Sequence, residues 1–176
     1  MKKMISRIIL ACAAMFTATA YADTYVTPLV GYQFQTSDTI GKQEKHLGEF
    51  QKNHATYGVQ VTNDSLVKGS EVGVEYLRTD SNLDSYQVGL VAYQPLGSSI
   101  FYATEGVGYT KLDGTLKDQE GAYFNVGVGA KKLLTNMITL KTEIRGQYQT
   151  QSSQWSPVAL VGFEFNTSEF GKPYSK

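Results

Sequence analysis

Apolar and polar residues alternate along most of the chain with a period of two, which is typical of β-strands. In the segment 140–148, LKTEIRGQY, the alternation separates a charged face from a mostly apolar face. The charged face carries Lys141, Glu143, Arg145 and Gln147. Such a strand fits a soluble barrel if its apolar face points inward, and a membrane barrel if that face contacts lipid.

Eight segments of about ten residues show this alternation, and this length spans a bilayer as a tilted strand. They cover approximately residues 24–36, 54–63, 70–79, 85–94, 100–111, 122–132, 138–149 and 156–166. Turn signals between them are Asn63-Asp64, Pro95-Leu96-Gly97, Asp113-Gly114 and Thr135-Asn136. The pattern predicts an all-β, eight-stranded antiparallel up-and-down transmembrane β-barrel over residues 23–166, followed by a short tail over 167–176.

The positions of the glycines favour the membrane barrel. Seven of them fall on polar strand faces, namely Gly31, Gly58, Gly73, Gly89, Gly127, Gly129 and Gly162. Glycine on a water-facing outer wall would weaken a strand without any gain. Inside an eight-stranded barrel, whose lumen is barely wide enough for side chains, it makes room. We therefore expect a polar lumen and an apolar outer wall.

The first 22 residues have the order of a secretory signal peptide. MKKMISR is cationic, IILACAAMFTATA is apolar but too short to span a bilayer, and AYA at 20–22 is a small-x-small cleavage site. A lipidated Cys12 is the weaker alternative, because it would leave only a stub of apolar residues before the cysteine. Cleavage after residue 22 leaves a mature chain without cysteine, so no disulfide is expected.

The charge balance of the mature chain argues against nucleic acid as a partner. Without the three basic residues of the leader, 13 basic residues stand against 16 acidic ones. No run of lysine or arginine forms a basic footprint. No apolar run of the mature chain is long enough for a transmembrane helix, so strands are expected to cross the membrane.

Three stretches of the chain carry a resemblance to a known family: TYVTPLVGYQF, LKTEIRGQYQ and SPVALVGFEF. They resemble the transmembrane domain of the outer membrane protein A (OmpA) family, over essentially the whole mature chain. The resemblance implies a barrel in the outer membrane of a Gram-negative bacterium, in contact with outer membrane lipids and lipopolysaccharide. It also implies insertion by the barrel assembly machinery, with Gly162 to Phe165 resembling the terminal-strand signal. We expect a monomer.

The chain departs from the OmpA pattern at two points. Full-length members continue into a periplasmic peptidoglycan-binding domain, and we expect none after Lys176. Members also hold acids and bases inside the barrel, and Glu143 and Arg145 match those of the seventh strand. The inward positions of the fourth segment are Gln87, Gly89, Val91 and Tyr93. None is the lysine that the family carries there, so a gate built on that lysine is not expected.

Charged residues on inward faces predict a salt-bridge network in the lumen. Its members are Glu71, Glu75, Lys131, Lys141, Glu143, Arg145 and Glu164. The glycines that make room for it are Gly127, Gly129 and Gly162. With a turn centred near Thr135, the expected cross-strand partners are Lys141 with Gly129 and Glu164, and Glu143 with Gly127 and Gly162. Buried charges must be paired, because removal of one partner costs roughly 3 to 5 kcal/mol.

A polar lumen is compatible with two functions. A closed network makes a plug, and the protein then serves envelope integrity or surface interaction. An open network makes a narrow, low-conductance porin for ions or small solutes. Because eight strands leave little space for water, we favour the plug.

A barrel enzyme that acts on lipids is a second alternative. Such chemistry needs a nucleophile and a base within reach of each other. The histidines are His46 and His54, and neither makes the His-x-Ser pairing of lipid A deacylase barrels. We therefore expect no catalytic residue. Two histidines, without a mature cysteine or a close carboxylate cluster, also predict no metal site and no cofactor.

The longest expected connection is the polar segment 37–53, which is predicted to be an external loop. Loop tips of such barrels commonly carry contacts. The candidate contact residues are Lys42, Lys45, His46 and Glu49. Mixed charge without an aromatic cluster also fits plain solvation.

Glu105 does not fit the alternation. In IFYATEGVGYT it shares the apolar face with Phe101, Ala103, Val107 and Tyr109. A carboxylate facing lipid costs on the order of 1 to 2 kcal/mol or more. We expect a β-bulge, which Gly106 would permit, to turn Glu105 inward. A lipid-facing catalytic acid is the alternative.

Overall fold

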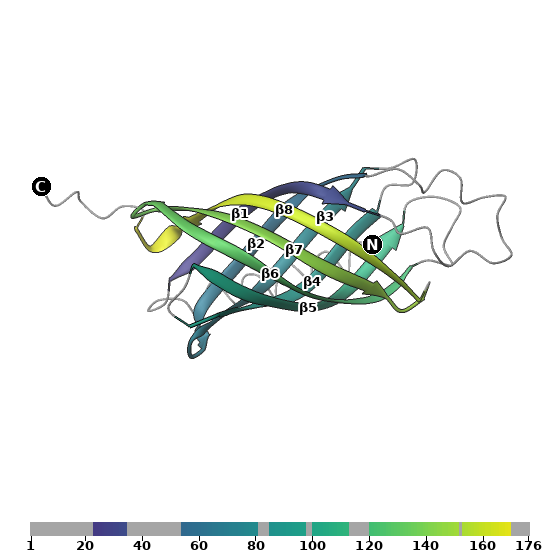
Figure 1. The fold of residues 1–176 in the computed structure, drawn as a ribbon, viewed down its shortest axis with the longest axis horizontal. Coiled ribbons are helices and arrows are strands. Elements are labelled where there is room, and N and C mark those ends of the chain that lie inside the picture. Colours follow the sequence, from purple (N-terminus) through teal and green to yellow (C-terminus); the bar gives the residue numbers. More distant parts are fainter. Residues whose placement is uncertain are drawn as a thin grey trace, which may run out of the picture.

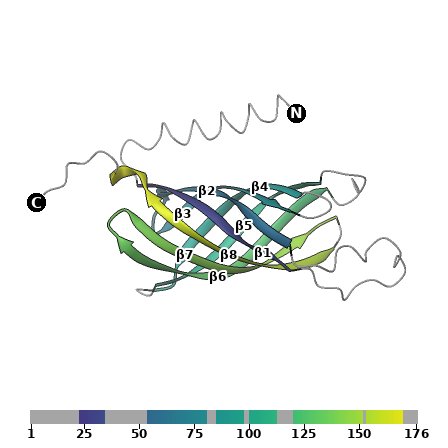
Figure 2. The same cartoon turned by 90° about the horizontal axis from the view of Figure 1, so that it is seen from above.

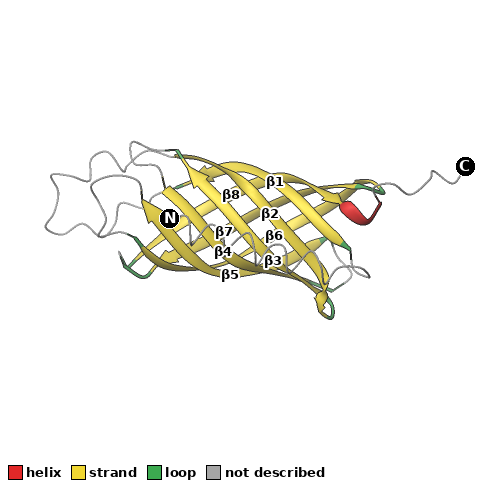
Figure 3. Ribbon diagram, turned by 180° about the vertical axis from the view of Figure 1, so that it is seen from behind, coloured by secondary structure: helices red, strands yellow, loops and turns green. Residues whose placement is uncertain are grey.

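The structure is a computed structural model that describes residues 23–34, 54–80, 85–97, 100–112, 120–151 and 153–169. The strands are β1 (Thr24–Gln33), β2 (His54–Val67), β3 (Ser70–Thr79), β4 (Ser85–Pro95), β5 (Phe101–Leu112), β6 (Gly121–Thr135), β7 (Ile138–Gln149) and β8 (Gln154–Asn166). A short 3-10 helix, η2 (Thr167–Glu169), follows β8 (Figure 3). The described residues contain no helix that is long and apolar enough to cross a membrane.

Neighbouring strands pair antiparallel around a complete ring, from β1 to β8 in chain order. The ring closes because β1 also pairs with β8, with Val30 opposite Val161. The strands are tilted relative to the long axis of the barrel (Figures 1 and 2). The predicted all-β, eight-stranded antiparallel barrel is therefore confirmed.

The two faces of the sheet have opposite character, as the alternation predicts. Thr27, Gln60 and Gln147 point into the lumen and have no exposed surface. Large apolar side chains cover the outside, including Val30, Leu90, Val107, Val128, Ile144 and Phe163. This apolar outer wall and polar interior are the arrangement of a barrel in lipid, and the reverse of a soluble barrel.

The two ends of the barrel differ in their connections. Short turns join β2 to β3, β4 to β5 and β6 to β7 at one end, where η2 also lies (Figure 1). Strands β1, β3, β5 and β7 finish at the other end of the barrel. Barrels of the outer membrane have short turns on the periplasmic side and longer loops on the external side. We use "periplasmic end" and "external end" in this sense.

The turn predicted at Asn63-Asp64 is wrong, because β2 continues to Val67. The turn comes instead at Gly69, whose φ of 82° lies in the left-handed region that glycine adopts without strain. Asp64 stays within the sheet, where its carboxylate accepts a hydrogen bond from the Tyr25 hydroxyl at 3.5 Å.

The predicted partners of Lys141 and Glu143 are also wrong, by two residues on each side. On β6 these residues face Lys131 and Gly129, and on β8 they face Gly162 and Leu160. The β6–β7 turn lies further along the chain than predicted. In this turn, the Thr135 hydroxyl accepts hydrogen bonds from the backbone N–H groups of Met137 and Ile138, at 3.2 and 3.1 Å. A slip of two residues keeps each side chain on its predicted face.

Glu105 points outward, so the bulge that was expected to turn it inward is wrong. The pairing of β5 with β4 runs without interruption from Ser85 to Pro95. Its pairing with β6 is equally regular from Phe101 to Thr110. Without an extra residue in either ladder, the alternation of β5 leaves Glu105 on the outer wall, where it is exposed.

Candidate functional site

The inward face of β7 supplies the centre of the lumen site. Lys141, Glu143, Arg145 and Gln147 follow one another at every second position, and all are buried. Strand geometry alone places them in one row, because alternate residues of a strand share a face. Arg145 has the largest of the fully buried side chains, and its charge decides what must surround it.

Arg145 is held by two carboxylates. Its Nη2 lies 2.6 Å from Oε1 of Glu75, and its Nη1 lies 3.2 Å from Oε1 of Glu143. The second carboxylate oxygen of Glu75 accepts a hydrogen bond from the Gln60 amide at 2.5 Å. Because β3 and β7 are four strands apart in the ring of eight, the pair of Arg145 with Glu75 spans the lumen.

Lys141 is packed against an aromatic ring. Its ammonium lies 3.3 Å from the centre of the Tyr93 ring, within the range of a cation–π interaction. Its ammonium also donates a hydrogen bond to the side-chain oxygen of Gln60 at 3.0 Å and lies 3.9 Å from a carboxylate oxygen of Glu164. Gln60 therefore links Lys141 to Glu75 and joins the two buried cations into one network.

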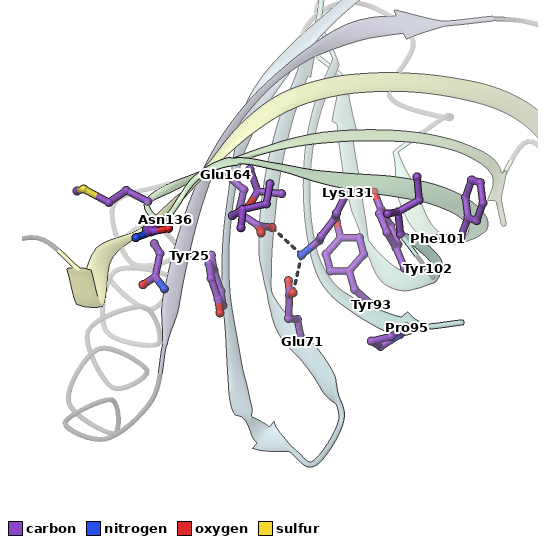
Figure 4. Close-up of a pocket in the computed structure, with 14 residues that line it drawn as sticks. Tyr25, Glu71, Tyr93, Pro95, Phe101, Tyr102, Lys131, Asn136 and Glu164 are labelled. Atoms are coloured by element: carbon purple, nitrogen blue, oxygen red, sulfur yellow. Dashed lines mark hydrogen bonds and ion pairs between the residues drawn. The ribbon is translucent and has the colours of Figure 1, made fainter. Parts of the chain in front are cut away.

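Lys131 forms a second layer toward the periplasmic end. Its ammonium bridges Glu71 at 2.5 Å and Glu164 at 2.8 Å (Figure 4). The rings of Tyr93 and Tyr102 each lie 5.8 Å from it. These side chains line a pocket of about 470 Å³ that extends to Asn136, Met137 and Asn166 near the β6–β7 turn.

The structure brings all seven residues of the expected network together. The acids Glu71, Glu75, Glu143 and Glu164 each lie within 4 Å of at least one of the three bases Lys131, Lys141 and Arg145. Four acids against three bases leave one carboxylate in excess. The protein's own cations occupy the central positions between these carboxylates.

The three lumen glycines lie where a side chain would collide. A Cβ atom on Gly127 would come within 2.5 Å of the Arg145 Cβ, and one on Gly129 within 2.3 Å of the Tyr102 ring. On Gly162 it would come within 2.4 Å of a β1 carbonyl. These glycines therefore allow Arg145 and Tyr102 to lie close to the wall of the barrel.

Sequence reasoning did not include Gln60, Tyr93 and Tyr102 in the network. The hydroxyl of Tyr102 lies 3.4 Å from a carboxylate oxygen of Glu143 and donates to the Thr142 carbonyl at 3.0 Å. Alternation places all three side chains inside, so the signal for their location was present. Their partners depend on contacts across the lumen, which a period of two does not reveal.

Other expected residues lie outside the described part of the chain. These are the leader, 1–22, and the loop residues Lys42, Lys45, His46 and Glu49. The tail beyond Glu169 is outside it too. Among the described residues, no group of three or more His, Cys, Asp or Glu side chains could hold a metal ion.

Comparison with known proteins connects this barrel to the outer membrane. The chain is 29% identical to outer membrane protein Omp38 of Acinetobacter baumannii, in an alignment of 195 positions that covers 90% of this chain and 52% of Omp38. The chain thus spans about half the length of this curated relative. No protein-family model matches the chain.

Two solved structures share the fold at low sequence identity. Neisserial surface protein A (NspA) superposes with a TM-score of 0.60 at 14% identity, over 81% of this chain and 96% of NspA. The N-terminal β-barrel domain of Pseudomonas aeruginosa OprF gives 0.55 at 18% identity, over 82% of this chain and 99% of that domain. Together with the closed sheet and the apolar outer wall, these likenesses identify the chain as an outer-membrane β-barrel protein with eight antiparallel strands.

Proposed function

We propose that this protein is a non-enzymatic outer-membrane barrel whose lumen is sealed by its salt-bridge network. Its role would then be envelope integrity or surface interaction through the external end, rather than transport. The observation that carries this proposal is the ion pair of Arg145 with Glu75 across the lumen, in which Nη2 and Oε1 lie 2.6 Å apart.

Energetics support a stable seal. Arg145, Glu75 and Glu143 are almost completely buried, and an unpaired buried charge costs several kcal/mol. A passage for ions would require these pairs to separate without water to replace them. Tyr93 and Tyr102 pack edge to face, with ring centres 5.3 Å apart, beside the same network. Bulky side chains therefore fill the lumen around the charges.

A narrow pore for small cations is the second candidate. The pocket of about 470 Å³ on the periplasmic side of Lys131 favours this function, because the pocket gives solutes a way in from the periplasmic end. The excess carboxylate of the network would attract cations rather than anions. On this view, Lys131 and Arg145 would have to move aside together to open a path.

Single-channel recording in planar bilayers separates the two candidates. The sealed barrel predicts no discrete conductance steps for the full mature chain. It also predicts none for Gln87→Ala, a lumen variant outside the network that controls for loss of volume. Reproducible steps in the unmodified protein whose amplitude changes in Glu143→Ala, but not in Gln87→Ala, would show that the network is a gate.

We also propose that the barrel assembly machinery recognises the end of β8. Phe163 is exposed on the outer wall, and Phe165 lies on the same face. This outward pair follows the pattern of the terminal-strand signal in barrels of the resembling family. Replacement of both phenylalanines by serine would reduce the amount of folded barrel in the outer membrane. The same change at Val128 and Ile144 is the control, which tests whether any loss of outward apolar surface has this effect.

A further inference from the structure

Glu105 lies on the outer wall among side chains that offer no hydrogen bond. Its direct cross-strand neighbours on this face are Ala92 on β4 and Val126 on β6. Along β5, the adjacent outward residues are Ala103 and Val107. All four are aliphatic, so the carboxyl group has no polar side chain beside it on the wall.

The residue also lies near the middle of the apolar band. Each residue of a tilted strand rises roughly 2.5 Å along the membrane normal. Glu105 comes four residues after Phe101 at the periplasmic end of β5, and six residues before Lys111 near the external end. It therefore lies about 10 Å from one end and about 15 Å from the other, in an apolar band about 25 Å tall.

The wall around Glu105 is hollowed. A depression of about 350 Å³ lies beside it, lined on the outer face by Val72, Leu90, Ala92, Val107, Phe124 and Val126. The small Ala92 leaves this room, whereas Leu90 and Phe124 stand exposed at its border. Small residues on a lipid-facing surface let another protein surface approach closely.

The chemistry of a carboxyl group favours a second copy of this chain as the occupant. An unpaired polar group in hydrocarbon is costly. A protonated carboxyl carries one hydrogen-bond donor and one acceptor, so two of them satisfy each other across a two-fold axis. Acyl chains offer neither group, and a different protein would have to bring its own polar group to the bilayer centre, where such groups are rare.

We propose that the wall around Glu105 is the contact face of a homodimer in the membrane. The two Glu105 carboxyl groups hydrogen-bond to each other on the two-fold axis, and Leu90 and Phe124 of each copy pack into the hollow of the other. This arrangement replaces the monomer expected from the sequence. It does not depend on whether the lumen is sealed.

Energy transfer between donor-labelled and acceptor-labelled full mature chains in lipid vesicles measures the association. We expect transfer that rises with protein density. Glu105→Gln keeps a donor and an acceptor, so its dissociation constant should stay within about threefold of the original. Glu105→Leu suits lipid but cannot hydrogen-bond, and it should weaken association at least about tenfold. Heat-modifiable gel migration shows that each variant has folded.

Disulfide cross-linking in native outer membranes tests the geometry. The mature chain has no cysteine of its own, because Cys12 lies in the leader. Ala92→Cys, directly opposite Glu105, should give a cross-linked dimer. Val30→Cys on β1, four strands away from β5, is the matched control and should not. The proposal is overturned by chains that stay apart at every density, by a Glu105→Leu variant that associates as tightly as the original, or by cross-links only to another protein.

Discussion

Arg145 on β7 and Glu75 on β3 join opposite sides of the barrel, with 2.6 Å between Nη2 and Oε1. Both side chains are shielded from solvent. The sheet alone closes the barrel through backbone hydrogen bonds, but it does not determine what fills the lumen. This pair, with Gln60 and Glu143 beside it, places a buried polar network across the interior.

Removal of the central base should destabilise the barrel strongly. Arg145→Ala leaves Glu75 and Glu143 buried without their cation, and we expect the free energy of unfolding to fall by about 3 to 5 kcal/mol. Urea titration in lipid vesicles measures this, with the fluorescence of Trp155 as the probe. Lys111→Ala, an exposed cation on the outer wall, should change stability by no more than about 0.5 kcal/mol. Equal effects of the two variants would contradict a structural network.

Two adjacent lysines provide a matched test of the second layer. Lys131 points into the lumen and bridges Glu71 and Glu164, whereas Lys132 is exposed on the outside. Because the bridging ammonium is only partly buried, we expect Lys131→Ala to cost about 1 to 3 kcal/mol. Lys132→Ala should be nearly neutral in the same urea titration. A larger loss for Lys132 than for Lys131 would reverse the assigned faces of β6.

The inward glycines should tolerate no side chain. A Cβ on Gly129 would lie 2.4 Å from the Thr142 carbonyl oxygen and 2.3 Å from the Tyr102 ring. We expect Gly129→Ala to cost about 1 to 3 kcal/mol through overpacking. Gly146→Ala is the control, because its Cβ would point outward and come no closer than 3.2 Å to a neighbour, the Trp155 ring. Refolding yields that are the same for both variants would show that the lumen has room to spare.

Much of the fold was predictable because a barrel imposes a simple rule on every strand. Alternation in segments such as 138–149 gave the strand, its inward face and its buried charges. The alternation could not determine register, since a slip of two residues leaves the faces unchanged. Register depends on turns, and the roles of Thr135 and Gly69 in those turns involve local hydrogen bonds and backbone angles rather than periodicity.

The partners within the site were less predictable than its members. Glu75 and Arg145 are 70 residues apart in the chain, and Lys141 and Gln60 are 81 apart. Only closure of the ring brings them together. The prediction for Glu105 failed for a different reason. A local rule about polarity suggested a bulge, but regular pairing on both sides of β5 keeps the residue facing outward.

The first loop should be separable from the barrel. The pairing of β1 with β2 already begins with Gln33 opposite His54, so the strands do not need the residues between them for their register. We expect deletion of 39–51 to leave a heat-modifiable barrel while it reduces binding of cells or ligands, if the external end is a contact surface. Binding that is undiminished in a folded deletion variant would remove this loop as the contact.

The fluorescence of one side chain can show whether the outer wall lies in lipid. Trp155 is the only tryptophan in the sequence, is 46% exposed and packs edge to face on Phe124, with ring centres 5.5 Å apart. It lies near the external end of β8, where aromatic residues mark the membrane interface. We therefore expect lipids brominated near the headgroup to quench its emission more than lipids brominated near the chain end. Quenching by aqueous acrylamide alone, in a sample with heat-modifiable migration, would mean that this wall faces water and that the outward apolar side chains serve another contact.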